Sequence, residues 1–118
     1  MTPEQVQAAI DAARTDALTH AEQEAANRYR EMELEAERPI RKYEAIRRIM
    51  ALPREEGVKP HSYSSAEALA ESDSEYSAFL STQRDVIRAG ILIRAKHWAA
   101  KNRAATGTAI LFNMGVMS

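Results

Sequence analysis

Two histidines and their neighbouring carboxylates are the residues of this sequence best suited to hold a metal ion. His20 has Asp16 and Glu24 one helical turn to either side, and His97 falls in a later helical stretch. If these stretches pack antiparallel, with facing residue numbers that sum to about 117, His20 lies beside His97. Imidazole and carboxylate groups together bind zinc. Histidines inside a helix bundle more often pack or cap charges, so the sequence favours no metal and leaves His20 and His97 as the candidate ligands.

Four basic side chains form a second candidate site. They lie on one outer stripe of the first predicted helix, opposite its apolar positions: Arg38, Arg41, Lys42 and Arg48. A stripe of this kind can follow a phosphate backbone, so nucleic acid is a candidate partner. Glu44 lies among these residues and weakens the positive field. A solvated face without a ligand is therefore the competing interpretation.

No catalytic motif accompanies these residues. The sequence holds no cysteine, which excludes disulfides, thiolate metal ligands and cysteine nucleophiles. It also lacks His-Glu-x-x-His, Glu-x-x-His, a phosphate-binding glycine loop and the Gly-x-Ser-x-Gly turn. We therefore predict a protein that is not an enzyme and uses no cofactor.

Composition points to long, solvent-exposed helices in one domain. The 118 residues include only 4 Gly, 4 Pro and 6% aromatic residues. The net charge of −1 gives no general attraction to nucleic acid or to an anionic membrane. No signal peptide and no apolar run of roughly 20 residues is present, so we expect a cytoplasmic protein that does not contact membranes.

The first helix is expected over residues 3–52. Thr2, Pro3 and Gln5 form a helix start. Pro39 removes a backbone hydrogen bond and should kink or restart the helix nearby. Apolar or small residues recur at three- and four-residue steps and predict its packed face: Val6, Ile10, Ala13, Ala17, Ala21, Ala25, Tyr29, Met32, Ala36, Ile40, Tyr43 and Met50.

A loop over about 53–64 and a second helix over about 65–105 are expected next. Pro53, Gly57 and Pro60 interrupt the first helix, and Ser64 with Glu67 forms a capping box for the second. One apolar face of the second helix comprises Leu69, Tyr76, Leu80, Ile87, Ile91 and Trp98. A second face, expected to contact another copy of the chain, comprises Phe79, Val86, Ile93 and Ala100. Residues 106–118 form an apolar C-terminal tail, expected to dock on a neighbouring subunit or to be disordered.

The order of charges predicts that the two helices pack antiparallel. The first helix is acidic over 22–37 and basic over 38–48, and the second is acidic over 67–75 and basic over 84–103. A turn near Val58 sets unlike charges side by side, with Glu22 as the expected partner of Arg94. Each exposed pair contributes only roughly 0.2 to 1 kcal/mol, so charge selects orientation while apolar burial stabilises. The predicted fold is all-α: a long, coiled-coil-like antiparallel helical hairpin that assembles into a helix bundle.

From Lys59 to Arg103 the chain resembles the small helical-hairpin proteins of tailed bacteriophages and prophages. The features that carry the resemblance are a turn followed by Ser-Ser-Ala-Glu-Ala, then Asp73-Ser74-Glu75-Tyr76, and an arginine-punctuated helix ending in Ile93-Arg94. The apolar end from Ala109 departs from the polar finish of that group. Some of its members are encoded near recombination genes, which implies work on DNA in a bacterial host cell.

Two functions stay open on these grounds. The first is a non-catalytic, oligomerising interaction or structural module whose partners are itself and another protein. The second is an accessory nucleic-acid-binding protein, linked to phage DNA recombination or replication, that acts through the four basic residues of the outer stripe.

Overall fold

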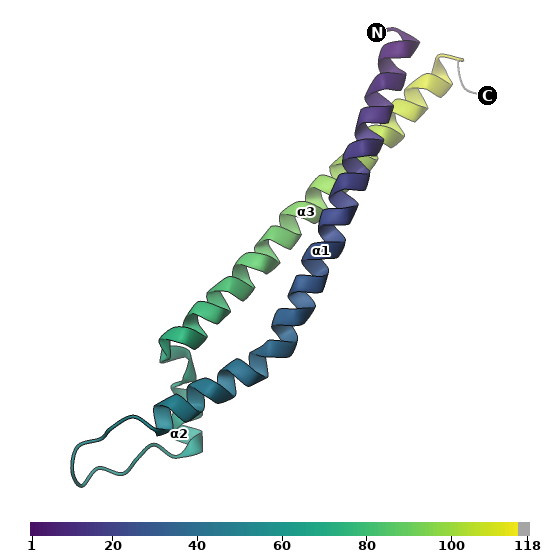
Figure 1. The fold of residues 1–118 in the computed structure, drawn as a ribbon. Coiled ribbons are helices and arrows are strands. Elements are labelled where there is room, and N and C mark those ends of the chain that lie inside the picture. Colours follow the sequence, from purple (N-terminus) through teal and green to yellow (C-terminus); the bar gives the residue numbers. More distant parts are fainter. Residues whose placement is uncertain (116–118) are drawn as a thin grey trace. The chain divides into compact units, whose positions relative to one another are not determined.

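The computed structural model describes residues 1–115, and every regular element among them is a helix (Figure 1). Helix α1 spans Pro3–Met50, α2 spans Tyr63–Ala68, the 3-10 helix η1 spans Ala70–Ser72, and α3 spans Ser74–Asn113. Helices α1 and α3 are the two arms of an antiparallel helical hairpin, which confirms the predicted all-α class. The chain divides into two compact units, which we call the terminal unit (1–28 with 88–115) and the loop unit (29–87).

The terminal unit is held together by a small apolar core. Val6 and Ile10 of α1 and Leu111 of α3 are almost completely buried against one another. Helix α1 begins as its sequence predicts. The backbone N–H of Thr2 donates to Gln5 Oε1 (2.8 Å) and that of Gln5 donates to Thr2 Oγ1 (3.2 Å), which is a reciprocal capping box.

The C-terminal tail predicted over 106–118 is wrong as a separate segment. Helix α3 continues to Asn113, and Leu111 belongs to the core of the terminal unit. The packed positions Ala100, Ala104, Gly107 and Leu111 keep the three- and four-residue steps of the helix, but most are too small to be recognised as a core face. Gly115, with φ 73°, follows the last turn as a helix-ending glycine. Residues 116–118 of the predicted tail lie outside the described residues.

Gly107 allows α1 and α3 to approach closely in the terminal unit. A Cβ atom placed on Gly107 would lie 2.5 Å from Ile10 Cγ1, closer than non-bonded carbon atoms approach one another. Replacing Gly107 with valine should therefore lower the free energy of unfolding by about 1 to 3 kcal/mol, as overpacked cores do. Urea unfolding followed by circular dichroism measures the change.

A matched second substitution tests that explanation of Gly107. Adding Ile10→Ala should recover part of the stability lost in Gly107→Val, because the methyl groups of the new valine then occupy the space vacated by Ile10. If the two substitutions simply add, steric conflict with Ile10 is not the cause.

The loop unit has the larger apolar core. Its buried members come from the end of α1 and from the α2, η1 and α3 segments that follow the loop: Ala45, Ile46, Ile49, Ala66, Ala70 and Tyr76. Phe79 and Leu80 pack against this cluster, and the Phe79 ring stacks on Tyr76 with centroids 6.4 Å apart. This core fixes the short helices against α1.

The second helix predicted over 65–105 is also wrong at its start. Helix α2 begins at Tyr63 and is capped by Ser62, whose Oγ accepts the Ser65 N–H at 3.2 Å. The chain then leaves helical geometry, and Asp73, with extended backbone angles, caps a new helix. The Tyr76 N–H donates to Asp73 Oδ2 at 2.9 Å. The 3-10 helix η1 and the capping residue Asp73 thus separate what the apolar spacing joined.

Helix α1 passes through Pro39 without ending or restarting. Pro39 is exposed, so water can hydrate the carbonyl that the missing N–H leaves without a helical donor.

The packed face of α1 differs from the prediction beyond Ala21. Its first members, Val6, Ile10 and Ala13, are buried, but the partly buried positions then continue through polar residues: His20, Glu24, Asn27 and Glu31. Tyr29 and Met32, which were expected to pack, are 67% and 71% exposed. Because the inward positions are polar, following hydrophobic residues along α1 leads onto its outer surface.

Candidate functional site

The two histidines do not meet in a metal centre. His97 Nδ1 lies 2.8 Å from Glu24 Oε2, and both side chains are mostly buried. The His20 ring instead contacts Gln23 Oε1 of its own helix at 3.2 Å. Among residues 1–115, no three histidine, cysteine or acidic side chains lie close enough together to hold a metal ion. The chemistry at this position is a polar pair between α1 and α3.

Glu24 is the carboxylate that organises this part of the terminal unit. The hydrogen bond from His97 is the main cause that lowers the pKa of Glu24, and the charges of Arg28 and Arg94 add to it. Arg28 also donates to Glu24 Oε1 at 3.0 Å. The prediction that Arg94 pairs with Glu22 is wrong, because the Glu24–His97 alignment sets the helices about one turn away from the predicted register.

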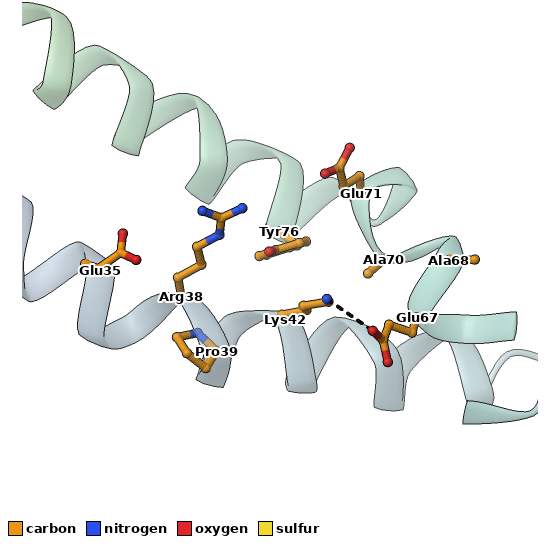
Figure 2. A pocket seen from close by; sticks show the side chains of 9 residues that line it. All are labelled: Glu35, Arg38, Pro39, Lys42, Glu67, Ala68, Ala70, Glu71 and Tyr76. Atoms are coloured by element: carbon orange, nitrogen blue, oxygen red, sulfur yellow. Dashed lines mark hydrogen bonds and ion pairs between the residues drawn. The ribbon is translucent and has the colours of Figure 1, made fainter. Parts of the chain in front are cut away.

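Arg38 and Lys42 of the basic stripe predicted on α1 line a groove of about 540 Å³ in the loop unit (Figure 2). Arg38 points toward the Tyr76 ring, and a hydrogen bond to the Tyr76 side chain is the main cause that raises the pKa of Arg38. Lys42 binds Glu67 at 3.4 Å. The groove also carries Glu35 and Glu71, so its acidic residues outnumber its basic ones.

The other two members of the stripe are paired as well. Arg48 binds both carboxylate oxygens of Asp73, at 2.9 and 2.7 Å, and Glu75 at 3.0 Å. Arg41 lies 3.7 Å from Glu37 and from Glu44. All four basic side chains therefore face carboxylates or a tyrosine of their own unit, and the stripe gives little net positive field for a phosphate backbone.

The face predicted for contacts between subunits is the face that packs inside the hairpin. Ala100 is completely buried, Phe79 packs on the core of the loop unit, and Val86 and Ile93 are partly buried. Ile87, Ile91 and Trp98, from the face predicted to be internal, are exposed instead, whereas Tyr76 of that face is buried. Both faces repeat at heptad spacing, so sequence periodicity alone could not distinguish them.

Helix α1 carries a second apolar face in the loop unit. Leu34, Ile46 and Ile49 point inward and are buried. The opposite side carries a row of exposed residues at three- and four-residue steps, interrupted only by Arg47, which we call the outer row: Tyr29, Met32, Ala36, Ile40, Tyr43 and Met50. Arg47 lies over the Tyr43 ring, 6.0 Å from its centroid. The outer row extends over about 30 Å at 1.5 Å per residue.

No protein-family model, curated protein or solved structure matches this chain. No helix of the described part of the chain is apolar over a length that would cross a bilayer.

Proposed function

We propose that this protein is a non-catalytic helical hairpin that associates with a second copy of itself and acts as an interaction or structural module. The outer row of α1 supports the proposal. Its five large apolar side chains lie along one exposed side, interrupted only by Arg47, on a helix that is already packed on its inner side. Extended apolar surfaces of this kind mark contacts between proteins, whereas isolated exposed apolar residues do not.

Charge complementarity selects an antiparallel pair of α1 helices about a twofold axis near Ile40. Glu33 lies beside the outer row before Pro39, and Arg47 lies within the row after it. In the antiparallel arrangement Glu33 faces Arg47 of the second copy. A parallel pair sets like charges together. The 3.4 Å contact that Glu33 makes with Arg30 of its own helix is exposed, so exchanging it for a contact with the partner costs little.

The resemblance to phage and prophage hairpin proteins supports a place for this module in the cytoplasm of a bacterial host. The loop between α1 and α2 contributes no residue to the outer row, so a dimer formed through that row leaves the loop of each copy to contact another protein.

Replacing Ile40 with glutamate tests the interface at its centre. The substitution sets two carboxylates near each other across the twofold axis, so the dimer dissociation constant should rise at least about a hundredfold. Sedimentation velocity over a range of concentrations measures it. Leu92→Glu is the matched control, because Leu92 is an exposed apolar residue of α3 outside the outer row. A wild-type chain that stays monomeric, or a dimer that Ile40→Glu leaves intact, contradicts the proposal.

A charge exchange tests the antiparallel direction in the same assay. Glu33→Arg alone should weaken the dimer because it sets two arginines together, and adding Arg47→Glu should restore it. Failure of the double variant to recover would exclude this register.

A further inference from the structure

The part of α3 in the terminal unit is strongly basic. Residues 88–115 contain no aspartate or glutamate, and their basic residues are Arg88, Arg94, Lys96, Lys101 and Arg103. The chain as a whole has a net charge of −1, so this segregation of charge is local. A segment with charge of one sign attracts a partner of the opposite sign.

Helix α1 neutralises only part of this charge. Asp16 binds Arg103 at 3.4 Å, and Glu24 is engaged by His97 and Arg28. No ion pair involves Arg88, Lys96 or Lys101 within the part of the chain that the structure describes. This differs from the stripe on α1, where each basic side chain has an acidic or tyrosine partner.

Three of the basic residues share one face of α3 with a tryptophan. The residues at three- and four-residue steps, which we call the basic-aromatic face, are Arg88, Ile91, Arg94, Trp98 and Lys101. The adjacent positions Gly90, His97 and Ala100 face α1, so the basic-aromatic face lies to one side of the packed seam. Trp98 is 67% exposed, and Lys96 lies on the other side of α3.

We propose that the basic-aromatic face binds single-stranded nucleic acid. An unpaired base stacks on the Trp98 ring, while phosphates lie beside Arg88 and Lys101, which are about 20 Å apart along the helix. Bases of a duplex are already stacked inside it and cannot use the ring in this way. A membrane surface fits less well, because α3 already packs its other apolar face against α1 and cannot lie along a bilayer on a wide apolar face.

Trp98 is the only tryptophan, so its fluorescence reports directly on stacking. Titration with oligothymidylate at low salt should quench the emission. The logarithm of the binding constant should fall with the logarithm of salt concentration with a slope of about −1.4, as expected for two phosphate contacts on a single strand. A labelled strand followed by fluorescence anisotropy allows variants without Trp98 to be compared with the wild type.

Variants distinguish a defined binding site on the basic-aromatic face from general electrostatic attraction to α3. Trp98→Ala should weaken binding by about five- to a hundredfold, the range for loss of one stacked base. Arg88→Gln and Lys101→Gln should each weaken it several-fold and make the salt slope shallower by about 0.7, whereas Lys96→Gln, with the same charge change on the other side of α3, should have a smaller effect. Circular dichroism confirms that each variant is helical.

Four results would overturn the proposal. They are no change in emission or anisotropy at low salt, equal weakening by Lys96→Gln and Lys101→Gln, equal affinity for a duplex of the same length, and a response to phosphatidylglycerol vesicles without any response to the strand.

Discussion

Replacing Ile46 with alanine should lower the free energy of unfolding by about 3 kcal/mol. Ile46 is 1% exposed at the centre of the loop-unit core, among Ala45, Ile49 and Tyr76. Truncation removes three carbon atoms from a packed site and leaves a cavity, and substitutions of this kind cost about 2 to 5 kcal/mol. Ala45 and Ala66 are too small to fill the space. Urea unfolding followed by circular dichroism at 222 nm, the wavelength for helix content, measures the change.

Ile91 supplies the matched control for this experiment. It is an isoleucine in a helix as well, but it is mostly exposed. Ile91→Ala should change the free energy of unfolding by less than about 0.5 kcal/mol, because little apolar surface is lost and alanine favours helix. Equal effects at Ile46 and Ile91 would show that the loop-unit core does not exist in solution.

Replacing Asp73 with alanine should have the second largest effect on stability, about 2 to 3 kcal/mol. The mostly buried carboxylate of Asp73 both caps a helix and binds an arginine. It accepts the Tyr76 N–H at the start of α3, and it accepts two hydrogen bonds from the Arg48 guanidinium. Loss of a helix cap costs about 1 kcal/mol, and a hydrogen bond to a charged group contributes about 1.5 to 3 kcal/mol. Asp16→Ala removes an exposed pair with Arg103 and should cost less than about 1 kcal/mol.

The same carboxylate makes stability depend on pH. The Arg48 hydrogen bonds are the main cause that lowers the pKa of Asp73 from 3.8 to about 2. A carboxyl group with a lowered pKa in the folded state contributes stability above its ordinary pKa and loses it as the pH falls toward the folded value. The wild-type advantage over Asp73→Ala should therefore be constant near neutral pH and decline between about pH 4 and pH 2. An advantage that persists unchanged at pH 2 would show that the charge is not involved.

The sequence was a good guide to the orientation of the helices. Opposed charge runs and a loop rich in proline and glycine predicted an antiparallel pair with facing numbers near 117. The observed contacts have nearly this register, as in Glu35 with Gln83 and Asp16 with Arg103. Charge order is a property of long stretches, so an error of one helical turn did not change the outcome.

The sequence was a poor guide to which face packs. Gln83 is buried and donates to Glu35 at 3.0 Å, and Glu24 with His97 fills a similar inward position in the terminal unit. Hydrophobic periodicity assigns such residues to the surface. Heptad spacing of polar residues, continued from Val6 and Ile10, is the signal that could have corrected the assignment.

The ion pairs that neutralise Lys42 and Arg48 of the basic stripe involve residues far away in the sequence. Lys42 binds Glu67 and Arg48 binds Asp73, each 25 positions later in the sequence. The apolar spacing predicted that both carboxylates belong to the first turns of one straight helix. The break between α2 and α3, together with the burial of Ala66 and Ala70 in the loop-unit core, places the segment that carries them against α1. Pairing that depends on such a break cannot be deduced from charge spacing.

The mostly buried Glu24–His97 pair also fixes the register of α3 against α1 in the terminal unit. If α3 slid along α1 by one heptad, Glu24 would face Gly90 or Ala104, and its carboxylate would lose the imidazole while remaining shielded from water. Seams made only of aliphatic residues tolerate such slippage, because one methyl group substitutes for another. The pair buries less apolar surface than two aliphatic residues would. In return, only the observed alignment of α1 and α3 lets the Glu24 carboxylate and the His97 imidazole bind each other.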